Sequence, residues 1–141
     1  IASENVDVDF LLIDTQGSLT KEMAQFLFQS SLIITPCRVS RDDIVGQGWI
    51  EVFLKQSNRD IKKAPILTVL NGVNKRSSIL SHVIEQLKED GVQVAETCIS
   101  QRVCFAETNV NKISVIGYNK PATEEIVDLT NEALNLIKSE A

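Results

Sequence analysis

The residues best suited by type and spacing to do chemistry lie near the start of the chain, in the sequence Asp14-Thr15-Gln16-Gly17. The short apolar run that precedes them, residues 10–13, is typical of a buried parallel strand. Ligands of open α/β sheets bind at the carboxyl edge, where this strand would deliver Asp14. A carboxylate there can order the water shell of Mg²⁺, and Gly17 would let a backbone N–H approach a terminal phosphate. The pattern predicts a nucleotide site in which Asp14 is the catalytic and metal-binding residue.

The run that ends in Asp14 resembles a Walker B segment of the P-loop nucleotidases. Its partner in those proteins, the phosphate cradle Gly-x-x-x-x-Gly-Lys-Ser/Thr, is not found in the 141 residues. The sequence begins at Ile1, and Met23 is its single methionine. We therefore expect part of an ATPase that lacks its phosphate-binding segment and is inactive as an enzyme by itself.

Composition and charge exclude several classes of protein. A net charge of −5 argues against a dedicated polycation for nucleic acid. No apolar run approaches the roughly 20 residues needed to span a bilayer, and no signal-peptide pattern precedes Asp14. The three cysteines, Cys37, Cys98 and Cys104, lack Cys-x-x-Cys spacing and are expected to be reduced thiols that pack as small apolar groups. We expect a cytoplasmic protein with a single domain over residues 1–141 and no membrane partner.

Short apolar runs alternate with longer amphipathic stretches along the chain. The sequence predicts strands at residues 10–13, 32–35, 66–70, 92–95 and 114–116, and helices at 20–29, 41–56, 78–90 and 124–138. Ser40 and Asp43 resemble a capping box, Thr123 is expected to cap the last helix, and Gly91 suits a helix C-terminus. Such alternation indicates βαβ units. The expected fold class is α/β, with a mostly parallel sheet flanked by helices, similar to part of a P-loop NTPase.

A second candidate, Asn71, follows the strand predicted at residues 66–70. A small GTPase also has an Asp-x-x-Gly segment and a later Asn, but guanine recognition needs Asn-Lys-x-Asp, and this chain has Asn71-Gly72-Val73-Asn74. A complete phosphorelay receiver is excluded because its acidic pair lies on a strand far upstream of its phosphoacceptor, and too few residues precede Asp14. The Asn71 amide offers both donor and acceptor to an adenine edge, so adenine is preferred to guanine.

With these residues, the chain resembles the ParA/MinD group of deviant Walker ATPases, especially ParA-type plasmid and chromosome partition proteins. Residues 9–17 resemble the family's Asp-Tyr/Phe-hydrophobic-Asp-Thr-Pro-Gly segment, with Gln16 in place of the proline. Residues 32–44 resemble its strand–Pro–loop–Ser–x–x–Asp–Ile stretch, Asn71 its strand-end Asn, and residues 101–116 its loop, short helix and following strand. The resemblance covers nearly the whole chain, as the part of the fold that follows the P-loop.

The resemblance implies ATP and Mg²⁺ as cofactors, bound between two subunits. It also implies slow hydrolysis that switches a dimer associating with DNA and with a centromere-binding partition partner. Asp14 would order the Mg²⁺ water shell, Gly17 would sense the γ-phosphate through its backbone, and Asn71 would contact adenine. Some relatives contact DNA through an arginine in the segment that matches residues 102–107. Arg102 is the candidate here, although one alignment places Cys104 at that position.

Other interpretations stay open for each of these residues. Asp14 could cap the next helix, Asn71 could form an Asx turn, and Arg102 could be a solvated surface charge. Trp49 and Phe53 stand four apart on a predicted helix, which indicates either core packing or a protein interface. The alternative function is a non-catalytic protein-interaction module that keeps the same fold and uses its helices for contacts.

Overall fold

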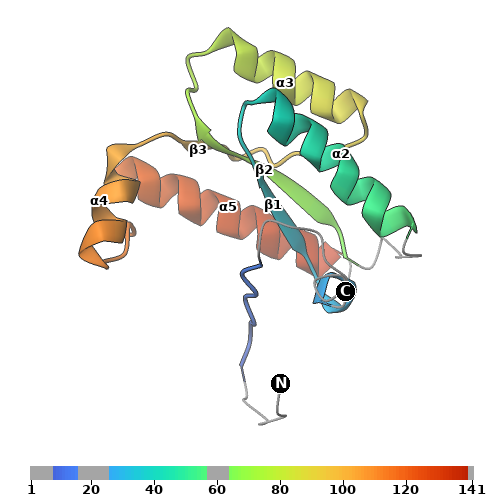
Figure 1. The fold of residues 1–141 in the computed structure, drawn as a ribbon. Coiled ribbons are helices and arrows are strands. Elements are labelled where there is room, and N and C mark those ends of the chain that lie inside the picture. Colours follow the sequence, from blue (N-terminus) through green and yellow to red (C-terminus); the bar gives the residue numbers. More distant parts are fainter. Residues whose placement is uncertain (1–7, 16–25, 57–63, 140–141) are drawn as a thin grey trace.

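The computed structural model describes residues 8–15, 26–56 and 64–139, and these contain a three-stranded parallel sheet (Figure 1). The strands are β1 (Ile33–Cys37), β2 (Ile66–Val73) and β3 (Ile99–Ser100), in the order β1-β2-β3. β2 is therefore the central strand, and it runs parallel to both of its neighbours. The predicted α/β class with a parallel sheet is confirmed.

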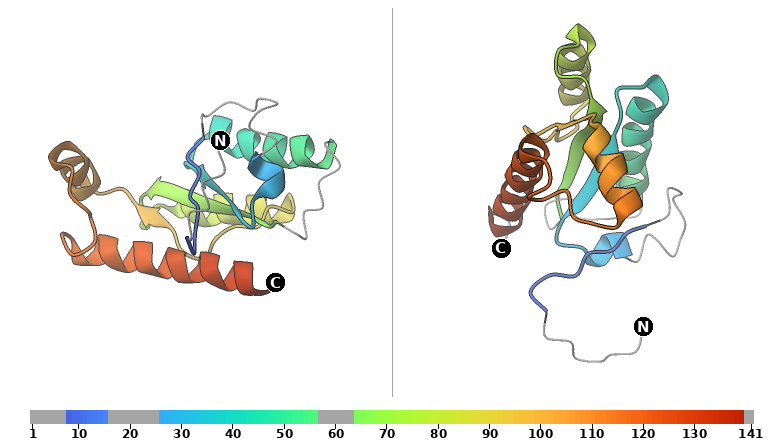
Figure 2. Two further views of the ribbon diagram at one scale, coloured as in Figure 1. Left: turned by 90° about the horizontal axis from the view of Figure 1, so that it is seen from below. Right: turned by 90° about the vertical axis from the view of Figure 1, so that its left-hand side faces the viewer.

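Helices cover both faces of this sheet. α2 (Arg41–Gln56) and α3 (Ser78–Glu89) lie on one face, and α5 (Lys120–Ser139) lies on the other, as the turned views show (Figure 2). α4 (Val103–Asn111) lies near the start of α5, at one side of the fold (Figure 1). Parallel strands need crossover connections, and these helices are what place apolar side chains over both faces.

The hydrophobic core forms on both faces of β2. On one face, the fully buried Leu70 belongs to a cluster with Val83 and Leu87 of α3. On the other face, the buried Leu67 belongs to a cluster with Ile126 and Leu129 of α5. Because β2 is covered on both sides, its first five residues are all buried, which is why its sequence reads as a nearly continuous apolar run.

Two helix ends follow the local signals in the sequence. Ser40 accepts a hydrogen bond from the Asp43 backbone N–H at 3.2 Å, which confirms Ser40 as the cap of α2. The Asp43 carboxylate accepts from the Arg38 N–H at 3.0 Å, so it ties the helix to the preceding loop. Gly91 follows α3 with φ of +80°, and its N–H donates to the Lys88 carbonyl at 3.0 Å. This confirms Gly91 as the residue that ends the helix.

The last helix begins earlier than the sequence predicts. α5 starts at Lys120, and Asn119 caps it, because the Asn119 side-chain oxygen accepts the Ala122 N–H at 3.0 Å. The prediction that Thr123 is the cap is wrong. Thr123 lies inside the helix, where its hydroxyl donates to the Asn119 carbonyl at 2.9 Å. Pro121 is compatible with the earlier start because N–H groups of a first turn need no intrahelical acceptor.

Some predicted strands are not found. Residues 10–13 show no strand pairing and Leu12 is 92% exposed, so the expected buried strand before Asp14 is not what the structure shows. A strand needs a neighbour for its backbone N–H and C=O groups, and within the described ranges β1 pairs only with β2. Residues 114–116 lie in a turn instead of a strand, and residues 92–95 contribute only an isolated bridge between Val94 and Thr68.

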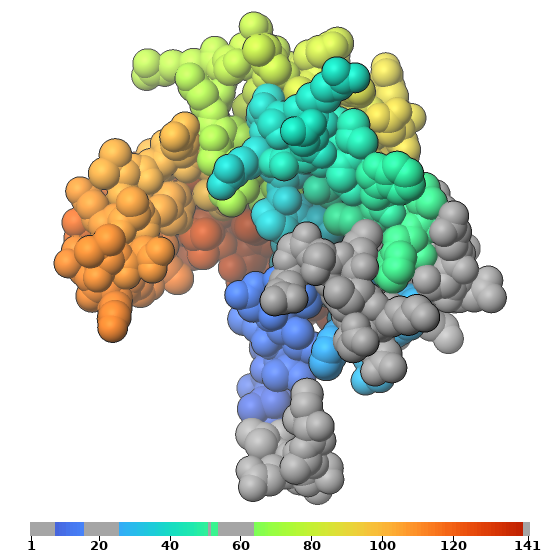
Figure 3. Space-filling view, viewed as in Figure 1, coloured from blue at the N-terminus to red at the C-terminus, as the bar shows by residue number. Residues whose placement is uncertain are grey.

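Apolar side chains are exposed in two places, on the segment predicted to be a buried strand and on the helix that carries Trp49. Residues 8–15, blue in Figure 3, project from the body of the fold, and Phe10 and Leu11 on them are 63% and 78% exposed. Trp49 on α2 is 65% exposed, whereas Phe53 packs against the cluster around Ile33. The predicted pair is therefore divided between surface and core. Within the described ranges, none of the helices has the length and apolar character to cross a membrane.

Candidate ligand site

Two adjoining depressions lie where the strands end. Because the strands are parallel, their carboxyl ends meet at one edge of the sheet, which is the usual ligand position in open α/β sheets. The first depression has a volume of about 690 Å³ and contains Asn71 in its lining, and the second has a volume of about 940 Å³ and contains Lys75. We call them the Asn71 depression and the Lys75 depression. Val73, Asn74 and Gln101 line both, so the two form one continuous edge.

The Asn71 depression brings together three segments that are distant in sequence. Arg38 and Ser40 reach it from the loop after β1, Asn71 from the end of β2, and Ser77 from the start of α3. Asn71 is exposed, so its amide is accessible. Next to it, Gly72 has φ of +67°, and the pairing of β2 with β3 is irregular at this point. The arrangement presents amide, hydroxyl and guanidinium groups, which suit a polar ligand.

A tight turn shapes the wall between the two depressions. The Asn74 side-chain oxygen accepts the Arg76 N–H at 3.1 Å, and the Asn74 carbonyl accepts the Ser77 N–H at 3.0 Å. These bonds make an Asx turn, so this conformation, considered for Asn71 from the sequence, is formed by Asn74. The Gln101 N–H donates to the Val73 carbonyl at 2.9 Å, which joins the loops after β2 and β3.

The Lys75 depression is rich in positive charge. Lys75 and Arg76 line it from the loop after β2, and Arg102 lines it from the loop after β3. Ser100 and Gln101 complete the polar part of its lining. This concentration of cations contrasts with the net charge of −5 on the whole chain and favours ligands with negative charge.

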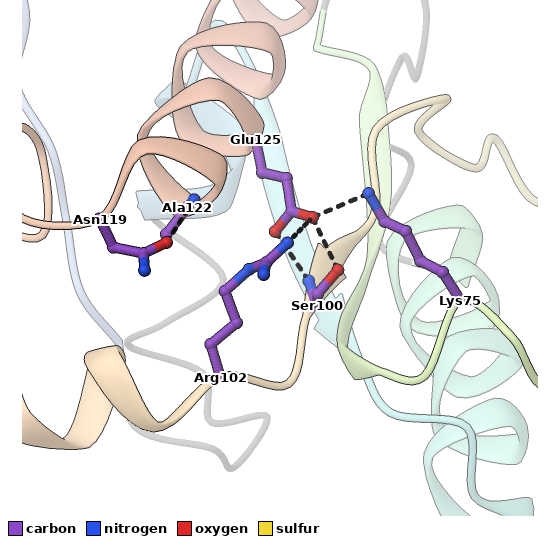
Figure 4. Close-up of polar contacts among 6 residues, drawn as sticks. All are labelled: Lys75, Ser100, Arg102, Asn119, Ala122 and Glu125. Carbon is purple, nitrogen blue, oxygen red and sulfur yellow. Dashed lines mark hydrogen bonds and ion pairs between the residues drawn. The ribbon is translucent and has the colours of Figure 1, made fainter.

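A single buried carboxylate lies behind this lining (Figure 4). Glu125 of α5 is 6% exposed, and its Oε1 accepts hydrogen bonds from Lys75 Nζ at 2.8 Å, Arg102 Nη2 at 3.0 Å and Ser100 Oγ at 2.6 Å. Its Oε2 accepts the Ser100 backbone N–H at 3.0 Å. The charge is thus paired and hydrogen-bonded, as a buried charge must be.

These contacts set the ionisation of Glu125. Burial by itself would raise the pKa of its carboxyl, but hydrogen bonds from Arg102, Lys75 and Ser100 outweigh burial and lower the pKa from 4.5 to about 2. The hydrogen bond between Arg102 and Glu125 also raises the pKa of the Arg102 guanidinium. Glu125 is therefore a permanent anion near neutral pH and is no candidate for a general acid or base there.

The cysteines are not positioned for nucleophilic chemistry. None of the three forms a disulfide and all are buried, which confirms that they pack as small apolar groups. Burial, followed by the nearby Asp43 carboxylate, raises the pKa of Cys37 to about 11. Burial also raises the pKa of Cys98, with smaller contributions from nearby charges. Both thiols therefore stay protonated near neutral pH.

The structure separates the residues that the sequence places at one site. Asn71 lines the candidate site, but Asp14 is exposed on the projecting segment and lines neither depression. Gly17 lies outside the described residues. Arg102, the candidate for DNA contact, lines the Lys75 depression and donates to Glu125.

Asp14, the expected Mg²⁺ ligand, lies apart from the candidate site. Mg²⁺ bound through water is held by carboxylates together with substrate phosphates. Asp14 is exposed and lines neither of the two depressions. Within the described ranges, no group of three or more His, Cys, Asp or Glu side chains could hold a metal ion. We therefore derive no chemical step through a metal.

Sequence reasoning missed Glu125, the residue that organises this edge. From the sequence, Glu125 and its neighbour Glu124 are acidic residues that favour the helix N-terminus. One signal could have found it: Glu125 stands directly before Ile126 and four residues before Leu129, so it lies on the apolar face of the helix. A carboxylate on such a face must find donors when the helix packs.

Comparisons with protein-family models and with curated proteins find no match to this chain. The resemblance to ParA-like ATPases therefore rests on the sequence motifs.

Proposed function

We propose that this chain is the sheet domain of a ParA-like partition ATPase and that the carboxyl edge of its sheet contacts an adenine nucleotide. The observation that carries the proposal is the position of Asn71, exposed at the end of β2 and lining a depression at the edge where α/β sheets bind ligands. Its amide offers a donor and an acceptor that complement the adenine edge. Arg38 and Ser40, in the same depression, offer charge-assisted and hydroxyl hydrogen bonds to ribose or phosphate oxygens.

The activity of a larger ParA-like protein is part of this proposal and follows from the resemblance. It comprises slow ATP hydrolysis with Mg²⁺, dimerisation, and association with DNA and a centromere-binding partner. Hydrolysis needs a phosphate cradle and its lysine, which this sequence does not contain. For the 141-residue chain we propose nucleotide contact without turnover. DNA contact has the least support because Arg102 already donates to Glu125.

The test is an NMR titration of the ¹⁵N-labelled chain with ATP and, separately, with GTP. We expect ATP to shift the Asn71 side-chain amide and the backbone of residues 38–40, with a Kd near 1 mM, about 4 kcal/mol, because most phosphate contacts are missing. GTP should shift them less. The Asn71→Ala variant should lose the response, and Asn109→Ala, an exposed amide on α4 outside both depressions, should keep it.

Two results would contradict adenine recognition at this edge. One is an unchanged Asn71 resonance at about 10 mM ATP, a concentration that would nearly saturate a site with a Kd of 1 mM. The other is an equal response to ATP, GTP and pyrophosphate, which would mean that only the negative charge is recognised.

A protein-interaction module is the second candidate, and one observation favours it. Apolar side chains are exposed on α4, where Val103 and Val110 are 74% and 81% exposed, and on the segment with Leu12. Exposed apolar patches commonly mark interaction surfaces. The gene sequence upstream of the codon for Ile1 separates the two candidates: an encoded phosphate cradle supports the ATPase, and its absence supports the module.

A further inference from the structure

Two loops that come from different strands form the Lys75 depression, and the sheet alone holds them together only weakly. The loop after β2 contributes Lys75, and the loop after β3 contributes Arg102. Pairing between these strands is limited to Asn71 with Ile99 and Val73 with Ser100, with an irregularity between the two positions. One backbone hydrogen bond, from the Gln101 N–H to the Val73 carbonyl at 2.9 Å, also joins them. The positions of the Lys75 and Arg102 side chains therefore depend on contacts from outside the sheet.

Glu125 provides this support from α5. Its carboxylate binds Lys75 at 2.8 Å on the loop after β2 and Arg102 at 3.0 Å on the loop after β3 (Figure 4). It also accepts two hydrogen bonds from Ser100, the last residue of β3, at 2.6 Å and 3.0 Å. All three partners line the Lys75 depression, whereas Glu125 does not line it. Arg102 Nε is buried and has no hydrogen-bond partner among the described residues, so the guanidinium is held through Nη2, which donates to Glu125.

A second glutamate on the same helix shows that this role is separate from helix packing. Glu132 accepts the backbone N–H groups of Glu96 at 2.8 Å and Thr97 at 3.2 Å. Neither of these residues lines a depression. Glu132 therefore attaches α5 to the fold in much the same way, and Glu125 alone of the two reaches the ligand-lining loops.

The geometry points to Glu125 as the positioning residue of the candidate site: one buried carboxylate holds the loops after β2 and β3 in the arrangement that receives the ligand. The identity of that ligand, an adenine nucleotide, rests on the proposed function, whereas the holding of the loops does not. Ordering Lys75 and Arg102 before binding avoids the entropic cost of ordering them during binding.

Charge and position have opposite effects in a test with an anion. Replacing Glu125 with Gln removes a negative charge and strengthens the attraction of Lys75, Arg76 and Arg102 for any anion. The same replacement releases the loops that Glu125 holds, and this loss of order weakens the binding of any ligand at the site. Adenosine carries no charge, so it reports on position alone, and pyrophosphate serves as the charged comparison.

The experiment compares the wild type with Glu125→Gln and with the matched control Glu132→Gln, all ¹⁵N-labelled. For adenosine, we expect the response of the Asn71 amide to be about five- to tenfold weaker in E125Q and unchanged in E132Q. The loops that Glu125 holds supply Asn74 and Gln101 to both depressions, and in E125Q these loops must be ordered on binding. In E125Q, the affinity for pyrophosphate should not fall by the same factor as the affinity for adenosine, because the lost negative charge favours the anion. If E125Q does not fold, Lys75→Gln, which removes a half-exposed partner, should weaken adenosine binding in the same direction.

A ligand-free measurement separates this proposal from the proposed function. In the wild type and in E132Q, the Lys75 ammonium and Arg102 guanidinium protons should exchange slowly with water, and in E125Q quickly. Backbone order parameters of residues 74–77 and 100–103 should fall only in E125Q. Wild-type affinity for adenosine in folded E125Q would overturn the proposal. If the wild type binds no adenosine, the proposed function fails, and the order parameters decide: unchanged values in E125Q overturn the positioning role.

Discussion

The Glu125 network makes a prediction about stability that needs no ligand. The Glu125→Gln variant keeps the size of the side chain and removes its charge. A pKa lowered from 4.5 to about 2 corresponds, at about 1.4 kcal/mol for each pKa unit, to roughly 3 kcal/mol as an upper limit. The network borders an open depression, and the Lys75 side chain is 52% exposed, so solvent weakens the ion pairs. We expect E125Q to lower the free energy of unfolding by about 1–2 kcal/mol at pH 7.

The loss should depend on pH in a defined direction. The folded-state pKa of Glu125 lies below its ordinary value, so the folded protein binds fewer protons at this group than the unfolded chain does. The stabilisation is therefore fully present above the ordinary value of 4.5 and is lost as the pH falls through about 2. The difference between wild type and E125Q should be constant from pH 8 to about pH 5 and should shrink steadily in more acidic solution.

Urea denaturation followed by circular dichroism at pH 7, 4 and 3 measures this difference. Val83→Ala, in the buried cluster on α3, is the control, because it removes only apolar contacts and its deficit should stay the same at each pH. The reasoning is refuted if the E125Q deficit at pH 7 is below about 0.5 kcal/mol, the range of ordinary surface changes. A deficit that stays constant down to pH 3 refutes it as well.

Further predictions concern the core, a helix end, the projecting segment and catalysis. Leu70→Ala, at a fully buried position, should cost about 2–5 kcal/mol in urea denaturation, and a cost under 1 kcal/mol would mean that the core is looser than described. Gly91→Ala should cost about 1 kcal/mol from φ of +80° alone, because no atom lies within 4 Å of the added Cβ, and an unchanged midpoint would contradict this. The exposed apolar residues 10–13 should cause self-association in light scattering, reduced by Leu12→Asp, whereas a stable wild-type monomer at high concentration would show the prediction to be wrong. The 141-residue chain should release no phosphate from ATP above blank, and release that Asp14→Ala abolishes would overturn this.

Elements with strong local signals were predictable from the sequence. The helix predicted at residues 41–56 has the bounds of α2, and its Ser40 cap forms as expected. The runs at 32–35 and 66–70 became β1 and β2, each with its start within one residue of the prediction. These features depend on apolar periodicity and on cap hydrogen bonds between residues a few positions apart, so neighbouring residues contain the information.

Elements that depend on distant partners were not predictable in the same way. The apolar run at 10–13 has the pattern of a strand, yet in the structure it has no neighbouring strand and is exposed. β3 has only two residues, too few to show a period, and it exists through its pairing with β2. Pairing decides whether such a segment is a strand, because the backbone hydrogen bonds of a strand are made to another part of the chain.

The candidate site also combines a feature that the local sequence indicates with features that depend on distant parts of the chain. The sequence by itself placed Asn71 at the carboxyl edge of a parallel sheet, although the strand runs on past Asn71 and ends at Val73. Only the tertiary structure decided that Glu125 is buried and that its partners are Lys75, Ser100 and Arg102. A carboxylate near a helix start is ordinary in sequence, and its ionisation and role come from donors on two other loops. Those donors meet it only when α5 packs against the sheet, since electrostatic and hydrogen-bond effects act through short distances in space.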